Sequence, residues 1–219
     1  MNDLAARCRS VLDRIRKAAE RSGRDPATIR LIAVTKTVRA ERIREAVQCG
    51  VAHIGENRLQ EALEKQGALA DLNVTWHFIG HIQTNKAAKI ARAFDWVQSV
   101  DRIEAAQKLN QHAGPRRLPV LIEVKLHPEP AKSGVEIPHA PLLVENVRSC
   151  ERLDLRGLMA IPPPSPDPET TRGYFTQLRR LAEKFGLPEL SMGMTSDFEI
   201  AVEEGATMVR IGAALFGPR

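Results

Sequence analysis

One lysine near the start of the chain has a position suited to chemistry. Lys36 ends a short apolar segment, residues 31–36 (LIAVTK), which follows Pro26 and precedes a helical pattern. The pattern predicts a buried strand with the lysine at its carboxyl end. At the mouth of an α/β fold such an amine can attack an aldehyde to form a Schiff base, provided that burial or a neighbouring cation lowers its pKa. Because most lysines at strand ends are solvated, this segment alone only makes Lys36 a candidate.

The last part of the chain contains two glycine-bearing segments that could bind a phosphate. Residues 191–196 (SMGMTS) end the seventh apolar segment and open a helical pattern, and residues 210–217 (RIGAALFG) end the eighth. In barrels of eight strands, the loops after strands seven and eight often build a phosphate site. Gly193 and Gly212 would let backbone N–H groups approach the ligand, and a helix N-terminus would add unpaired donors.

Three residues in these segments have competing interpretations. Ser196 and Glu199 fit a capping box, in which each side chain bonds the other's backbone amide. In that case Thr195 would be the better hydroxyl for a phosphate. Arg210 lies in an otherwise apolar strand, so it either reaches solvent at the strand end or faces the barrel mouth. Inside the mouth it would need an acceptor, because an unpaired buried guanidinium is costly.

Short apolar segments alternate with helical patterns along the whole chain, and this rhythm predicts the elements that position these residues. The predicted strands are residues 31–36, 52–55, 75–80, 96–100, 119–125, 155–161, 189–194 and 208–211. The predicted helices are residues 40–48, 59–69, 84–93, 102–112, 141–152, 169–185 and 197–204, with an extra helix at 3–22. The alternation favours parallel strands with right-handed crossovers.

Eight such strands indicate an α/β fold, a single (β/α)8 TIM barrel over residues 1–219. The alternative is an open, doubly wound sheet, but no GxGxxG motif follows the first strand. The proline-rich residues 161–168 predict a stiff loop after the sixth strand.

Composition excludes several classes of protein. No apolar run reaches the roughly 18 residues that a membrane span needs, and the polar start lacks an apolar signal core. We therefore expect a cytoplasmic protein without a membrane partner. The three cysteines are widely separated and form no CxxC pair, so neither a disulfide framework nor a metal site is predicted.

A net charge of +5 and seven basic residues among the first 24 could indicate a nucleic-acid surface. The same residues fit the solvated face of an amphipathic helix, because Leu4, Cys8, Val11 and Ile15 recur at helical spacing between them. No recognition motif accompanies the charge, and aromatic residues make up only 4% of the chain. A nucleic-acid partner is therefore the weaker interpretation.

Taken together, eight motifs resemble the YggS/PROSC family of pyridoxal phosphate homeostasis proteins, in order and over nearly the whole chain. They are AVTKT (33–37), IGEN (54–57), WHFIG (76–80), QTNK (83–86), KSG (132–134), RGLMAI (156–161), GMTSD (193–197) and VRIG (209–212). The fold of that family resembles the N-terminal barrel domain of alanine racemase, in agreement with the eight predicted strands.

The resemblance implies pyridoxal 5′-phosphate (PLP) as the cofactor. Lys36 would hold it as an internal aldimine, and Arg210 would face its pyridine nitrogen. The segment 193–195, with Gly212 and Ala213, would bind the phosphate. The full cofactor-binding set is Lys36, Asn57, His77, Met159, Ser191, Gly193, Met194, Thr195, Arg210, Gly212 and Ala213. Asn57, His77 and Met159 would line the pocket around the ring.

Two positions depart from the family's pattern. The family usually has serine where Thr195 stands, and threonine or serine where Ala213 stands. The first change keeps a hydroxyl. The second removes one side-chain contact to the phosphate, and a lost hydrogen bond to a charged group costs about 1.5–3 kcal/mol. We therefore expect weaker cofactor retention than in a chain with threonine at 213.

The same residues indicate a carrier rather than an enzyme. An arginine at the pyridine nitrogen leaves the ring a poorer electron sink. Alanine racemase uses a lysine and a tyrosine on opposite faces of the ring, the tyrosine coming from a second domain. Here the single tyrosine, Tyr174, falls in a predicted outer helix, and we expect no second domain.

The family resemblance thus implies a monomeric, non-catalytic PLP carrier or buffer in vitamin B6 homeostasis, which would hand the cofactor to apo PLP enzymes. The alternative is a PLP-dependent racemase or a related enzyme with a single base. Four further lysines, Lys86, Lys89, Lys125 and Lys132, are candidates for a second PLP site.

Overall fold

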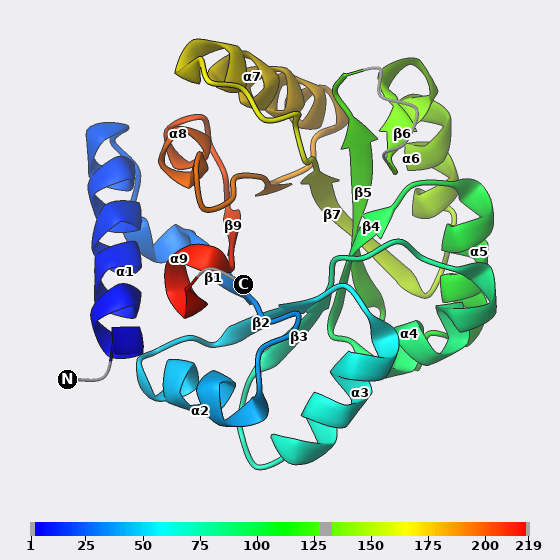
Figure 1. Cartoon of the computed structure of the whole chain (residues 1–219). Helices are drawn as coiled ribbons and strands as arrows, with labels where there is room; N and C mark the ends of the chain where they lie inside the picture. Colours follow the sequence, from blue (N-terminus) through cyan, green and yellow to red (C-terminus); the bar gives the residue numbers. More distant parts are fainter. Residues whose placement is uncertain (1–2, 128–132, 218–219) are drawn as a thin grey trace.

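The computed structural model describes residues 3–127 and 133–217, in which short strands alternate with helices (Figure 1). The strands are β1 (Arg30–Val34), β2 (His53–Glu56), β3 (Thr75–Phe78), β4 (Trp96–Val100), β5 (Leu118–Lys125), β6 (Val135–Glu136), β7 (Leu153–Met159), β8 (Glu189–Ser191) and β9 (Met208–Ile211). The helices are α1 (Asp3–Arg21), α2 (Ala40–Gln48), α3 (Leu59–Ala68), α4 (Ala87–Ala93), α5 (Ile103–His112), α6 (Ala140–Arg148), α7 (Pro168–Phe185), α8 (Phe198–Glu203) and α9 (Ala213–Phe216). Short 3-10 turns occupy Pro26–Thr28, Thr84–Lys86 and Ile137–His139.

The strands close into a barrel. Their order is β4-β3-β2-β1-β9-β8-β7-β5-β6, every pair of neighbours is parallel, and the additional pairing of β4 with β5 completes the ring. β6 has two residues and lies outside the ring on β5. The predicted eight-stranded barrel with helices between its strands is therefore confirmed, and Figure 1 shows the helices arranged around it.

Several strands end earlier than the sequence predicts, because the chain turns away at the carboxyl end of the barrel to form the loops. β1 ends at Val34 rather than at residue 36, and β8 ends at Ser191 rather than at residue 194. Lys36 and Gly193 consequently lie in loops at this end of the barrel.

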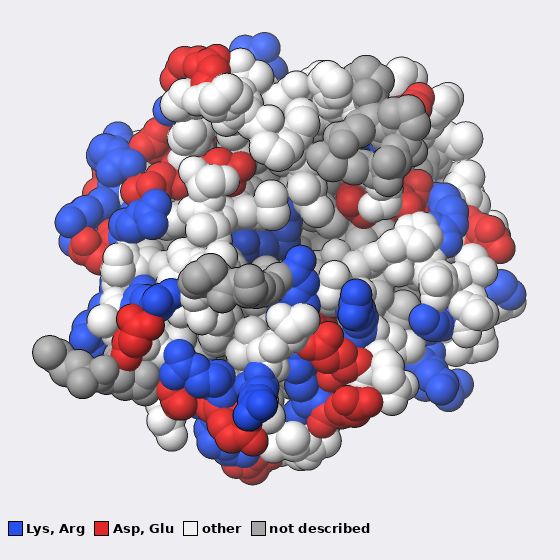
Figure 2. All heavy atoms as spheres, in the orientation of Figure 1, with Lys and Arg blue, Asp and Glu red and all other residues white. Residues whose placement is uncertain are grey.

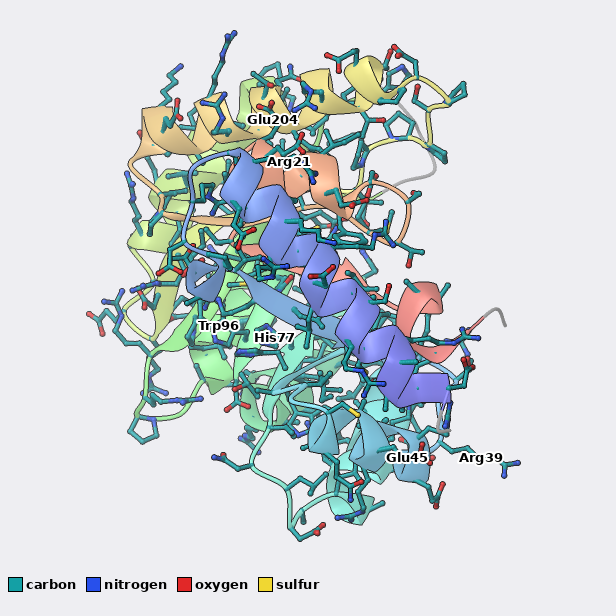
Figure 3. The ribbon with its side chains drawn as sticks, turned by 90° about the vertical axis from the view of Figure 1, so that its left-hand side faces the viewer. Arg21, Arg39, Glu45, His77, Trp96 and Glu204 are labelled. Carbon is teal, nitrogen blue, oxygen red and sulfur yellow. The ribbon has the colours of Figure 1, made fainter. Side chains whose placement is uncertain are left out.

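The predicted extra helix is α1, which crosses the outside of the barrel (Figure 3). Its buried residues recur every three or four positions and pack toward α2, α8 and α9. Most of its basic residues are paired with carboxylates: Arg16, for example, with Asp13 at 2.5 Å, and Arg21 with Glu203 of α8 at 2.7 Å. These pairs fit the solvated face of an amphipathic helix.

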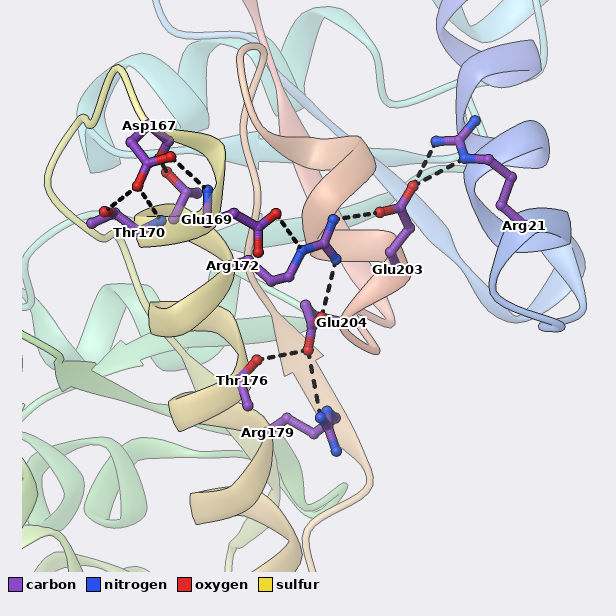
Figure 4. Close-up of polar contacts among 10 residues, drawn as sticks. Arg21, Asp167, Glu169, Thr170, Arg172, Thr176, Arg179, Glu203 and Glu204 are labelled. Atoms are coloured by element: carbon purple, nitrogen blue, oxygen red, sulfur yellow. Dashed lines mark hydrogen bonds and ion pairs between the residues drawn. The ribbon is translucent and has the colours of Figure 1, made fainter.

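Ion pairs fasten α8 on its other side as well (Figure 4). Arg172 of α7 reaches Glu203 at 2.9 Å and Glu204 at 3.1 Å, while Arg179 reaches Glu204 at 3.4 Å. Each exposed pair contributes at most about 1 kcal/mol, but together they hold α8 between α1 and α7. The loop that precedes α8 contains the predicted phosphate segment, so its position depends on this anchorage.

The core has two parts. A large apolar layer fills the space between strands and helices, and a small cluster of Ile32, Leu121, Met159 and Met208 lies inside the barrel. The rest of the interior includes buried polar side chains. Within the described ranges, no helix is both long enough and apolar enough to cross a membrane.

Candidate functional site

Lys36 lies in the turn directly after β1, with a half-buried side chain. The next residue, Thr37, has φ of 63°, in the left-handed region that a β-branched residue rarely adopts. Its backbone N–H donates a hydrogen bond to Glu61 Oε1 of α3, which holds the turn in place. Figure 2 shows basic side chains inside a hollow near the centre of the face of the molecule that it draws.

A buried ion pair supports the same turn from below. Lys65 Nζ of α3 donates to the Thr35 carbonyl oxygen, to Glu56 Oε1 and to Glu61 Oε1, each at 2.6 Å. The Thr35 hydroxyl donates to Glu56 Oε1, also at 2.6 Å. Burial raises the pKa of Glu56, although its hydrogen bonds from Lys65 and Thr35 oppose the shift. Thr35, the residue before Lys36, is thus tied both to α3 and to the end of β2.

Asn57 follows β2 at the same end of the barrel. Its Oδ1 atom is buried and has no hydrogen-bond partner among the described residues. Gly80, after β3, fixes its backbone: a Cβ at residue 80 would lie 2.1 Å from the Asn57 carbonyl oxygen, so only glycine allows the two segments to approach. A buried orphan acceptor is costly in a folded protein, and a ligand donor at this place would satisfy it.

The loop after β8 brings backbone N–H groups to the mouth. Gly193 has φ of 89°, and a Cβ there would lie 2.5 Å from Ala201 Cβ, so this close approach to α8 requires glycine. The Met194 N–H is already used, because it donates to Asp197 Oδ1 at 2.6 Å. The segment 193–195, which we expect to bind the phosphate, therefore offers one free backbone N–H donor fewer than the sequence predicts.

The loop after β9 meets this loop. The Ala214 N–H donates to Thr195 Oγ1 at 3.4 Å, which links the start of α9 to the segment before α8. Among the described residues, none accepts a hydrogen bond from the backbone N–H groups of Thr195, Ser196 and Ala213. Three donors from two loops are thus available to an anion, as the sequence pattern suggests.

The capping-box interpretation of Ser196 and Glu199 is wrong. α8 is capped at Asp197 without a side-chain cap bond, and Glu199 accepts a hydrogen bond from Arg14 of α1 at 2.7 Å. The physical reason is tertiary: a partner 185 residues away in the chain binds Glu199. Ser196 is consequently left without the capping role.

Arg210 faces inward and is only 3% exposed. Its Nη1 donates to Ser191 Oγ at 2.6 Å, and its Nη2 donates to the Ala160 carbonyl oxygen at 2.9 Å. Burial lowers the pKa of Arg210 to about 10, while the carboxyl groups of Glu123 and Asp197 oppose this shift. The guanidinium therefore stays charged at neutral pH with N–H groups to spare, since it has five donors.

Sequence reasoning missed Glu123, a buried carboxyl group on β5 that is 5% exposed. The Ser133 hydroxyl donates to its Oε1 at 3.1 Å. Burial raises the pKa of Glu123 to about 7, with Asp101 adding to the shift and Arg210 and Lys125 opposing it. The one signal in the sequence is its spacing of two from Leu121, which faces the barrel interior.

His77 and Met159 lie in the interior. His77 is fully buried, and both ring nitrogens are bonded: Nδ1 to Gln98 Nε2 at 2.9 Å and Nε2 to His53 Nδ1 at 3.1 Å. Burial lowers its pKa well below the usual value. Met159 packs in the inner apolar cluster. Lys132, one of the possible second lysines, lies outside the described residues.

Comparison with known proteins gives a consistent picture. Residues 8–219 match the model of the alanine racemase N-terminal domain family. The chain is 49% identical to the pyridoxal phosphate homeostasis protein of Pseudomonas aeruginosa, over all of this chain and 97% of that one. It is 44% identical to the protein of the same name from Aquifex aeolicus, over 95% of each.

Solved structures agree. PipY of Synechococcus elongatus without PLP has a TM-score of 0.86 at 39% identity, covering 98% of this chain and all of that one. The same protein with PLP bound has a TM-score of 0.84 at 38% identity, with the same coverage. Alanine racemase of Corynebacterium glutamicum, at 18% identity and a TM-score of 0.67 over 97% of this chain and 61% of that one, shares the fold. The chain thus belongs to the pyridoxal phosphate homeostasis proteins, a family with the alanine racemase N-terminal barrel.

Proposed function

We propose that this chain binds pyridoxal 5′-phosphate, holds it as a Schiff base on Lys36, and acts as a carrier or buffer for the cofactor. One observation carries the proposal: Lys36 lies at the same end of the barrel as an orphan buried acceptor on Asn57 and a buried cation, Arg210. A relative 38% identical in sequence, PipY, has been solved with PLP bound. Relatives of up to 49% identity carry the name pyridoxal phosphate homeostasis protein.

The chain's own groups match the parts of this cofactor. The free N–H groups of Thr195, Ser196 and Ala213 suit its phosphate, because backbone donors bind anions without charge of their own. The orphan Oδ1 of Asn57 suits a hydroxyl donor on the ring. Arg210 suits the pyridine nitrogen, to which it would donate a hydrogen bond from an N–H group that Ser191 and Ala160 leave free.

The character of Arg210 favours carriage over catalysis. When bound, PLP supplies an electron sink whose strength depends on protonation of its ring nitrogen. With a pKa of about 10, Arg210 keeps its own proton at neutral pH. It therefore donates a hydrogen bond without transferring the proton, and the ring stays a weak sink. Tyr174, the only tyrosine, lies in α7 with its ring against His127, at a centroid distance of 6.3 Å.

A weak single-base enzyme is the second candidate, and Glu123 is the observation that favours it. A carboxyl group with a pKa of about 7 can both accept and donate a proton at neutral pH. Incubation with L-alanine in deuterated water separates the candidates. The carrier function predicts no α-deuteration above that of free PLP, whereas enzymatic exchange that Glu123→Gln abolishes would establish the enzyme.

The proposal is tested by the absorption spectrum of the purified protein with added PLP, followed by borohydride reduction and peptide mass spectrometry. We expect a Schiff-base band and a pyridoxyl adduct on Lys36, both lost in Lys36→Ala. Lys184→Ala is the matched control, because Lys184 is exposed in the last turn of α7, the end of that helix that leads back to the start of β8. A protein that takes up no PLP would refute the proposal, and so would an adduct that persists in Lys36→Ala.

A further inference from the structure

Five polar side chains form a continuous series of hydrogen bonds across the barrel interior: Arg210, Ser191, Gln98, His77 and His53. Arg210 Nη1 lies 2.6 Å from Ser191 Oγ, and Ser191 Oγ lies 2.7 Å from Gln98 Oε1. Gln98 Nε2 lies 2.9 Å from His77 Nδ1, and His77 Nε2 lies 3.1 Å from His53 Nδ1. The first four are buried. Figure 3 labels His77 beside Trp96, on which its ring stacks at 5.8 Å.

Arg210 has donors only, so it sets the direction of the first hydrogen bond in this series, and the contacts of Gln98 set the next ones. Ser191 Oγ must accept from it, so the serine hydroxyl hydrogen is free to point to Gln98 Oε1. The Gln98 amide nitrogen then faces His77 and donates to its Nδ1. The second N–H of that nitrogen points to Met208 Sδ, and the two heavy atoms lie 3.3 Å apart. If the amide were reversed, its oxygen would face the sulfur atom instead.

The same logic fixes the histidines. His77 Nδ1 accepts, so its proton is on Nε2, which donates to His53 Nδ1. His77 is neutral, because burial disfavours its charged form. An amide neither gains nor loses a proton at neutral pH, so the series cannot relay protons through Gln98. What it can do is orient its members, since each has one satisfied arrangement.

We propose that Gln98, supported by His77, is a positioning residue that fixes the Ser191 hydroxyl and, through it, the guanidinium of Arg210. Ser191 holds Nη1 and the Ala160 carbonyl oxygen holds Nη2, so the plane of the guanidinium is set at two points. Without Gln98 the serine hydroxyl loses its acceptor and rotates freely, and one of the two points loosens. The inference rests on the proposed function in one respect, that Arg210 faces the cofactor ring.

The first test needs no cofactor. Nitrogen-15 NMR of the histidines in the ligand-free protein reports which ring nitrogen carries the proton. We expect His77 to be protonated on Nε2 and to keep that tautomer across neutral pH. In Gln98→Leu we expect the Nδ1 signal to shift, because its donor is gone. A His77 protonated on Nδ1 in the native protein would reverse the series and overturn the inference.

The second test measures the effect on the cofactor. We expect Gln98→Leu to raise the PLP Kd about fivefold, as for one lost neutral hydrogen bond, and to shift the band of the bound cofactor in the direction that Arg210→Gln shifts it. The double variant should shift the band no further than Arg210→Gln alone, because the two residues act through one contact. Leu121→Val is the matched control, an apolar change in the inner cluster that should leave the band unmoved.

The outcomes separate the two proposals. An unshifted band in Gln98→Leu, or additive shifts in the double variant, would overturn the positioning role while PLP binding stands. If the native protein takes up no PLP, the proposed function fails, and the histidine tautomer still decides whether the series has the direction argued here. Borohydride trapping on Lys36 in Gln98→Leu at saturating PLP should remain complete, which distinguishes a positioning defect from loss of the fold.

Discussion

Lys65 Nζ and Glu56 Oε1 form a buried ion pair at 2.6 Å, in which the lysine side chain is 9% exposed and the glutamate is fully buried. The Lys65 ammonium has three acceptors within 2.6 Å, including the carbonyl oxygen of Thr35. All its donors are therefore used inside the protein, and Lys65 supports the turn that carries Lys36 instead of competing with Lys36 for an aldehyde.

Removing the Lys65 amine should be strongly destabilising, because Glu56 would remain buried without its partner. We expect Lys65→Met to lower the free energy of unfolding by about 3–5 kcal/mol, measured by urea denaturation at pH 7. Lys89→Met on the exposed side of α4 is the control and should change it by less than about 0.5 kcal/mol. A loss below 1 kcal/mol in Lys65→Met would contradict the structural role of the pair.

Glu123 predicts a pH dependence of stability. Its pKa rises from an ordinary value near 4.5 to about 7 in the folded protein, mainly through burial. The folded state therefore binds the proton more tightly, and the stability that this supplies is fully present below pH 4.5 and is lost as the pH rises to 7. Between pH 5 and pH 8 we expect the native protein to lose up to about 3 kcal/mol of stability that the Glu123→Gln variant does not lose. Parallel stability curves for the two proteins over that range would disprove the shift.

Ala213 predicts an effect on cofactor retention. The residue is exposed at the start of α9, beside an unpaired backbone N–H, so a threonine there fits without a clash. We expect Ala213→Thr to lower the PLP Kd by about tenfold or more, because a hydroxyl donor to a charged group contributes about 1.5–3 kcal/mol. Ala213→Val has the same shape without the hydroxyl and should leave the Kd unchanged. Equal effects of the two variants would assign the gain to shape rather than to a hydrogen bond.

Gly80 predicts a local defect at Asn57. A Cβ at residue 80 would lie 2.1 Å from the Asn57 carbonyl oxygen, and backbone must move to admit it. We expect Gly80→Ala to cost at least about 1–3 kcal/mol of stability and to weaken PLP binding. Gly67→Ala is the matched control: it has nothing within 4 Å, lies in α3 and should stabilise the protein by about 0.5–1 kcal/mol. Calorimetry that ranks the two variants alike would refute the contact.

The barrel was predictable because the eight strands of the ring are largely apolar segments and the helices between them follow a period of 3.6, and both signals are local. β6 was not predicted, because a strand of two residues shows no periodicity in its hydrophobic pattern. The capping box at Ser196 failed because Arg14, far away in the chain, binds Glu199. Local sequence cannot reveal such a partner.

The interior polar residues were harder to interpret. Gln98 is a polar residue in a largely apolar strand, Trp96–Val100, and the sequence alone gives no role for it. Its role is visible only in the closed barrel, where it lies beside Ser191 and His77. Arg210 was singled out by the same kind of contrast, but its two protein acceptors come from β8 and the end of β7. Such contacts depend on strand order and register, which the hydrophobic pattern leaves open.

The attachment of α1 to α8 also has a consequence for how the protein forms. Arg14 and Arg21 bond Glu199 and Glu203, which follow them by 185 and 182 residues. α1 therefore leaves the ribosome well before its partners on α8 are made. Contacts between such distant segments carry a large loop-closure entropy. The part of the α1 apolar face that packs on α8 and α9 therefore stays uncovered until those helices are made, and it is a surface that a chaperone would shield during synthesis.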